Sequence, residues 1–126
     1  MKILNLLTAL ALATAGQTAL AHGEAHDHQP LHGGVVVEAS DMDFELVVQA
    51  DRVALYVRDH GKAADLKGAT GKLTLLAGSA KTEAQLAPVG DRLEAKGSFP
   101  TAAGTKVVAT VQLAGKKPAN VRFALK

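Results

Sequence analysis

The stretch FELVVQADRVALYV, from Phe44 to Val57, decides the fold class. Large apolar residues alternate with other residues on both sides of Ala50-Asp51, at Phe44, Leu46 and Val48 and again at Val53, Leu55 and Val57. A period of two puts one face of each run into a core, which is the pattern of a half-buried β-strand. The two runs therefore predict a β-hairpin.

Short β-branched or alternating runs, separated by Gly, Asp and Pro, continue on both sides of this hairpin. The further expected strands are 35–38, 72–76, 82–86, 92–96, 105–113 and 120–125. No window after residue 34 sustains a helical apolar period over three turns. Seven or eight short antiparallel strands favour an all-β fold, a β-sandwich of immunoglobulin-like or Greek-key type, with a small barrel as the alternative.

The expected core consists of the inward-facing apolar residues of these strands. They are Val35, Val37, Phe44, Leu46, Val48, Val53, Leu55, Val57, Leu73, Leu75, Leu86, Leu93, Val107, Ala109, Val111, Leu113, Val121, Phe123 and Leu125. A chain of 126 residues allows one domain, which we place at 35–126. A net charge of +2 with one Tyr, three Phe and no Trp argues against nucleic-acid binding.

Residues 1–21, MKILNLLTALALATAGQTALA, are expected to be a signal peptide. Lys2 precedes an uncharged run of Leu and Ala, and Ala19-Leu20-Ala21 offers small residues at both recognition positions of a signal-peptidase site. The alternative is a retained anchor helix, although the run is shorter than a membrane span needs. We expect export to the periplasm and no stable membrane anchor after cleavage.

Residues 22–34, HGEAHDHQPLHGG, read as a flexible His-rich tail, because Leu31 is their only large apolar residue. Neutral imidazole is the commonest side-chain metal ligand, and carboxylates offset the charge of an ion. The segment therefore predicts a metal site whose candidate ligands are His22, His26, His28, His32, Glu24 and Asp27. The alternative is a solvated linker whose histidines have no ligand role.

The fifth histidine, His60, lies between Asp59 and Gly61 at the end of an expected strand. It is the remaining candidate ligand, since an adjacent carboxylate can orient an imidazole; the alternative is an exposed turn residue. Gly33 and Gly34 after His32 would let the backbone turn sharply and another group approach closely. A nearby acidic stretch is expected to be a solvated rim that could add a ligand: Glu38, Asp41, Asp43 and Glu45.

The residue types present favour particular ions. With no Cys, and only Met42 beyond the initiator, soft Cu(I) and Ag(I) are disfavoured. A set of His and carboxylate ligands suits Cu(II) first and Zn(II) next. If cleavage follows Ala21, the α-amine and imidazole Nδ1 of His22 could chelate Cu(II) with a further His, unless His merely happens to follow the cleavage site. No hydrolase, zinc-protease or nucleotide-binding motif occurs, so we expect no enzyme.

The region 32–76 resembles a known family. The matching residues are His32-Gly33-Gly34, Phe44-Glu45-Leu46-Val47, Leu55-Tyr56-Val57, Asp59-His60-Gly61-Lys62 and Gly68-Ala69-Thr70-Gly71. They are similar to small exported proteins of heavy-metal efflux systems and to the β-rich N-terminal region of periplasmic adaptor (membrane-fusion) subunits of heavy-metal RND pumps. Ala63-Ala64 stands where Lys-Pro is expected, and the helical hairpin and lipoyl-like segments of a full adaptor are lacking. The resemblance implies periplasmic metal handling without fixing the ion.

Two functions from different classes follow. The first is a divalent-metal-binding protein, of the copper or zinc class, that acts in heavy-metal homeostasis or efflux. The second is an interaction module that docks on an efflux adaptor or on another copy of itself, with the His-rich tail secondary.

Overall fold

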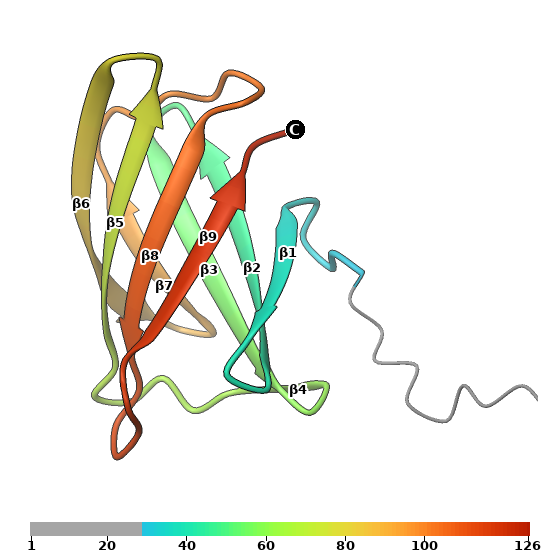
Figure 1. Ribbon diagram of the computed structural model, residues 1–126. Helices are drawn as coiled ribbons and strands as arrows, with labels where there is room; N and C mark the ends of the chain where they lie inside the picture. Colours follow the sequence, from blue (N-terminus) through green and yellow to red (C-terminus); the bar gives the residue numbers. More distant parts are fainter. Residues whose placement is uncertain (1–28) are drawn as a thin grey trace, which may run out of the picture.

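Nine β-strands form the regular structure of this protein in a computed structural model that describes residues 29–126 (Figure 1). They are β1 (Val35–Ala39), β2 (Met42–Gln49), β3 (Arg52–Asp59), β4 (Lys62–Ala63), β5 (Thr70–Ala77), β6 (Ala80–Val89), β7 (Arg92–Lys96), β8 (Lys106–Gln112) and β9 (Ala119–Ala124). None of these described residues is helical. The prediction of an antiparallel all-β domain is confirmed, with nine strands where seven or eight were expected, because the two-residue β4 gives no periodic signal.

The strands pair antiparallel in the order β1-β2-β3-β7-β6-β5-β8-β9, with β4 added to β3. The ten-residue β6 has two partners, since residues 80–86 pair with β5 and residues 87–89 pair with β7. The sheet curls until Cα atoms of β9 lie within 8 Å of β1, which nearly closes a barrel (Figure 1). The more specific expectation of a sandwich is not confirmed, because β6 joins the two halves into one path of paired strands.

Two tight hairpins shape the region that carries the site. The predicted β2–β3 hairpin is confirmed, with Gln49 opposite Arg52 across the turn. The β1–β2 turn consists of Ser40 and Asp41, whose φ angles are 52° and 61°. Positive φ at both turn residues suits the right-handed twist of the flanking strands, so this short turn holds β1 directly against β2.

The core fills the space inside the curled sheet. All but four of the predicted core residues are buried, and the exceptions, Val35, Val37, Val48 and Leu125, are partly buried against the others. Five further apolar residues join this core from strand ends and loops: Met42, Leu66, Ala69, Phe99 and Ala119. They were missed because an alternating pattern identifies strand interiors and says nothing about loops that fold inward.

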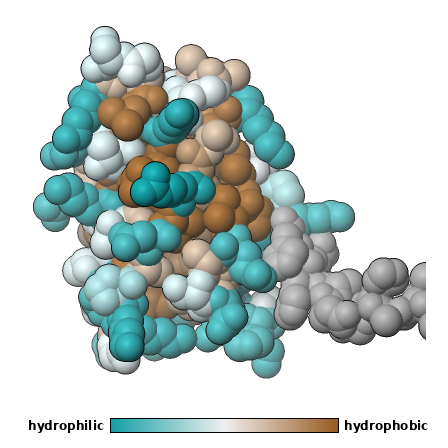
Figure 2. Space-filling view, viewed as in Figure 1, coloured by the Kyte–Doolittle hydropathy of each residue, from teal (hydrophilic) through white to brown (hydrophobic). Residues whose placement is uncertain are grey.

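Several apolar residues near the junction between β1 and β9 are only partly buried. Figure 2 shows apolar side chains near the centre of this face, with a polar side chain lying across them and others around them. Val35, Val37 and Leu125 are among the residues that are only partly buried. Residues 29–126 include no helix with the length and apolar character needed to cross a membrane.

Candidate functional site

A buried carboxylate on β2 fixes the chain that leads into the fold. Glu45 alternates with Phe44 and Leu46, which both point into the core, so its side chain lies on the outer face of the sheet. Three backbone N–H groups nevertheless donate to it. The Leu31 nitrogen lies 2.9 Å from Oε1, and those of His32 and Gly34 lie 2.7 Å and 2.9 Å from Oε2. The segment 29–34 therefore covers Glu45 completely, and its side chain is 0% exposed.

Arg58 on β3 completes this group, which we call the Glu45 anchor: Glu45, Arg58 and the backbone of residues 29–34. The Arg58 guanidinium donates to Glu45 Oε1 at 3.3 Å and to the Gln29 carbonyl oxygen at 3.1 Å. Residues 29–34 belong to the segment assigned to the tail from the sequence, and here their backbone has specific partners on β2 and β3. The anchor thus fixes the point at which the His-rich segment meets the domain.

The expectation that the acidic stretch is a solvated rim is wrong for two of its four members. Glu45 is buried by the chain segment folded over it, and Asp43 is only 9% exposed. Glu38 and Asp41 are exposed. A polar position in an alternating strand normally faces water, and the segment that covers Glu45 has too few apolar residues for its docking to be predicted.

Gly33 and Gly34 have different roles at this junction. Gly33 has a φ angle of 74°, a left-handed conformation that glycine adopts without strain. At Gly34, a Cβ would lie 2.3 Å from the Leu46 carbonyl oxygen and 2.9 Å from the Val47 Cγ2 atom. The sharp turn and the close approach expected from these two glycines are both present.

His32 lies against the outer face of β3. Its ring stacks on Tyr56, with centroids 3.6 Å apart and an interplanar angle of 9°. No hydrogen bond to its ring nitrogens is found within the described part of the chain. The anchor holds the His32 backbone and Tyr56 holds the ring, so this imidazole has a defined position with its nitrogens available.

His60 occupies the tip of the β3–β4 turn, with a φ angle of 53°. Its Nδ1 lies 2.6 Å from Asp59 Oδ1, and its side chain is 77% exposed. Lys116, in the β8–β9 loop, donates to Asp59 Oδ2 at 3.2 Å. The Lys116 ammonium and the His60 ring hold the pKa of the Asp59 carboxyl below its ordinary value. The imidazole is oriented by its neighbour, as the sequence suggested.

The two described histidines lie at different places. His32 stacks on Tyr56 within β3, whereas His60 lies in the turn that follows the last residue of β3. His60 instead borders a shallow depression with Glu38, Asp41 and Asp43. Within residues 29–126, no group of three or more His, Asp or Glu side chains is arranged to hold a metal ion. The other candidate ligands lie outside the described residues: His22, Glu24, His26, Asp27 and His28.

Burial and hydrogen bonding have opposite effects on the pKa of the Glu45 carboxyl, and their balance sets its charge. Burial raises the pKa of the Glu45 carboxyl, and the hydrogen bonds from Gly34, Leu31, His32 and Arg58 outweigh burial and lower it below its ordinary value. Glu45 is therefore ionised at neutral pH.

The anchor should weaken in acid. A carboxyl with a lowered folded-state pKa stabilises the fold above its unfolded pKa of about 4.3, and this contribution is lost as the pH falls through the folded value. We expect the difference in unfolding free energy between the wild type and Glu45→Gln to be constant from pH 7 to about pH 5 and to shrink below it. Urea unfolding at several pH values measures this difference. If this difference in unfolding free energy became larger as the pH falls, the lowered pKa of Glu45 would be contradicted.

No protein-family model, curated protein or solved structure matches this chain. The resemblance of residues 32–76 to metal-efflux proteins therefore stays a prediction.

Proposed function

We propose that this protein is an exported, non-enzymatic metal-binding protein of the periplasm that acts in heavy-metal homeostasis or efflux. It binds a divalent transition ion, Cu(II) in preference to Zn(II), through its His-rich N-terminal segment. The ligands come from His22, His26, His28 and His32, with Glu24 and Asp27 as oxygen donors. This donor set is the one that borderline divalent ions prefer.

The observation that carries this proposal is the position of His32. Its backbone donates to Glu45, its ring stacks on Tyr56, and Arg58 holds the Gln29 carbonyl, so the C-terminal end of the His-rich segment is fixed. A ligand whose position is already set loses less conformational freedom when it binds an ion. The fold thus holds one imidazole of the proposed ligand set, that of His32, in place before an ion binds. The other three histidines of the set precede it closely in the sequence.

His60 is outside the proposed ligand set. It lies in the turn beyond the end of β3 and borders a depression whose lining residues do not include His32. Its ring is bound to Asp59 in an exposed turn, which makes it a matched control for the histidines of the segment.

The test is a calorimetric titration of the processed protein with Cu(II) and with Zn(II) at pH 7.5. We expect binding by the wild type, and a loss of at least about tenfold in affinity for the His26→Ala/His28→Ala variant, because each lost ligand removes a metal bond that water replaces poorly. His60→Ala should leave the affinity within about twofold. Binding should weaken below about pH 6.5, where imidazole takes up a proton.

Two results would overturn the proposal. One is the absence of heat with both ions. The other is a His60→Ala variant that loses affinity while His26→Ala/His28→Ala retains it, which would move the site to the β3–β4 turn. Circular dichroism of each variant shows whether the β-fold is kept.

A second function, the interaction module, is favoured by the junction between β1 and β9. These two strands lie close together, yet among residues 29–126 they are not paired by backbone hydrogen bonds. Unpaired strand edges beside partly buried apolar residues can add a strand from another chain. In this function the barrel docks on an efflux adaptor or on a second copy, and the His-rich segment is secondary.

Removal of residues 22–28 separates the two functions. The metal-binding function predicts that metal affinity and metal resistance of the producing cells are lost together. The interaction function predicts that resistance barely changes and that association, followed by sedimentation for self-association or by pull-down of an adaptor, persists.

A further inference from the structure

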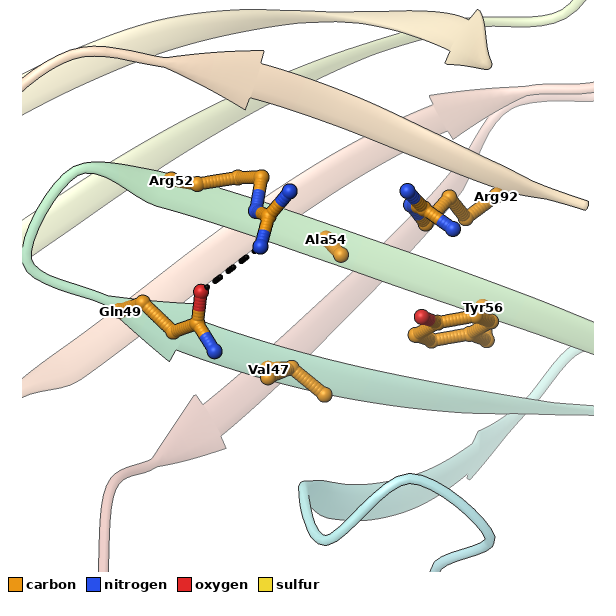
Figure 3. Close-up of a pocket in the computed structure, with 6 residues that line it drawn as sticks. All are labelled: Val47, Gln49, Arg52, Ala54, Tyr56 and Arg92. Carbon is orange, nitrogen blue, oxygen red and sulfur yellow. Dashed lines mark hydrogen bonds between the residues drawn. The ribbon is translucent and has the colours of Figure 1, made fainter. Parts of the chain in front are cut away.

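A polar pocket lies on the outer face of the sheet, across β2, β3 and β7 (Figure 3). It has a volume of about 250 Å³ and is lined by Val47, Gln49, Arg52, Ala54, Tyr56 and Arg92. The small side chain of Ala54 forms its floor, and the guanidinium groups of Arg52 and Arg92 reach over this floor from opposite ends. The Tyr56 ring lies beside Arg92.

The two arginines are held differently. Arg92 Nε donates to Oε2 of the buried Glu94 at 2.8 Å, and a weaker contact joins Nη1 to the exposed Asp91 at 3.4 Å. Arg92 is thus held by two carboxylates, through Nε and more weakly through Nη1, and no contact to its Nη2 is found among residues 29–126. Arg52 Nη2 donates to the neutral Gln49 Oε1 at 3.1 Å, and within the described part of the chain Arg52 has no carboxylate partner.

A second positive charge lies near Arg52, so its own charge is not offset by its surroundings. Lys96 lies directly opposite Arg52 in the β3–β7 pairing, and both side chains are exposed. Like charges at directly opposed positions of an antiparallel pair destabilise it. No carboxylate contact to Lys96 is found among residues 29–126. An anion at Arg52 would relieve this repulsion.

The polar groups of the pocket are predominantly donors. Both arginines carry only N–H donors, and Tyr56 has a phenolic O–H. The Gln49 carbonyl oxygen is occupied by Arg52, which leaves the Gln49 amide hydrogens to donate. None of the six lining residues is acidic. Drug-sized ligands occupy pockets of about 300–1,000 Å³, so this pocket suits a smaller ligand.

We propose that this pocket binds a small oxyanion, a carboxylate or a phosphate, between Arg52 and Arg92. Arginine forks match the paired oxygens of both groups. Gln49 and Tyr56 add hydrogen bonds, and Ala54 leaves room for the ligand above the strand. The pocket contains none of the proposed metal ligands, and because its Tyr56 also stacks on His32, the test uses metal-free protein.

Tyr56 provides a direct signal for this test, since it is the only tyrosine of a chain without tryptophan. Metal-free protein is titrated with inorganic phosphate and, separately, with succinate, at constant ionic strength kept by sodium chloride. We expect a saturable change in tyrosine fluorescence and saturable NMR shifts of the amides of Arg52, Ala54, Tyr56 and Arg92. The anion with the tighter saturation identifies the ligand class.

Variants decide whether the arginines hold the anion. Arg52→Gln should weaken binding at least about tenfold, because a charge-assisted hydrogen bond is lost. Arg122→Gln is the matched control, since Arg122 is an exposed arginine on β9, away from the lining residues. It should change the affinity less than about twofold. The proposal fails if neither anion shifts these amides saturably, or if both variants weaken binding equally, as unspecific charge attraction would require.

Discussion

Glu45→Ala is expected to lower the free energy of unfolding by about 3–5 kcal/mol, the range found when one partner of a buried ion pair is removed. The substitution leaves the Arg58 guanidinium, whose side chain is 9% exposed, without its carboxylate. It also removes the acceptor of three backbone N–H groups in residues 31–34. Urea unfolding followed by circular dichroism gives the change in free energy.

The matched control for this variant is Glu83→Ala. Glu83 pairs with Lys81 at 3.3 Å, and both side chains are about half exposed, so this loss should stay below about 1 kcal/mol. The double variant Glu45→Ala/Arg58→Leu should be less destabilised than the sum of its single changes, because it leaves no buried charge. A Glu45→Ala loss as small as that of Glu83→Ala would show that Glu45 is not an anchor.

A second readout of Glu45→Ala follows residues 29–34 themselves. The amides of Leu31, His32 and Gly34 should lose their protection from hydrogen exchange, and the His32 ring resonances should lose the shift caused by Tyr56. Protected amides in this variant would mean that other contacts hold the segment.

Gly34→Ala is expected to destabilise the protein by about 3 kcal/mol, at the upper end of the cost of overpacking. The new methyl group would lie 2.3 Å from the Leu46 carbonyl oxygen, and backbone inside a paired strand yields little. The accessible response is to lift residues 29–34 away from β2, which also removes a donor from Glu45. Urea unfolding and amide exchange of residues 31–34 measure both effects.

A comparison with Gly33→Ala distinguishes the effect of steric crowding at Gly34 from the effect of backbone strain. At Gly33, a Cβ would meet nothing within 4 Å, so Gly33→Ala suffers only the strain of a positive φ angle, about 1–2 kcal/mol. We expect Gly33→Ala to be clearly milder than Gly34→Ala. Equal effects would mean that the approach of Gly34 to Leu46 is not tight in solution.

The strands were predictable because alternation is a local signal. Residues 44–57 form a hairpin in which five of the six alternating apolar residues are buried and Val48 is partly buried, and 92–96 is a strand with the expected ends. The curled order of strands was not predictable, since it depends on the pairing of β3 with β7, about 40 residues apart. The division of β6 between two partners is likewise a property of the whole sheet.

In the candidate site, too, features set by local residue types could be predicted, whereas those set by distant contacts could not. The exposed turn of His60 and the roles of Gly33 and Gly34 follow from local residue types. The burial of Glu45 does not, because it results from a segment without apolar character folding over β2. Tyr56 and Arg58 were likewise not singled out as supports of that segment, although their places on the outer face of β3 follow from the alternation that buries Leu55 and Val57.

The contact between Arg58 and the Gln29 carbonyl has a consequence for the proposed binding of an ion by the His-rich segment. Seven residues, 22–28, separate this fixed point from the start of the expected mature chain, and a fully extended chain spans at most about 3.6 Å per residue. If His22 binds an ion as proposed, that ion would stay within about 25 Å of Gln29. An acceptor bound to this domain within that radius would meet the ion at an effective concentration in the millimolar range, so the position of the bound acceptor would govern transfer.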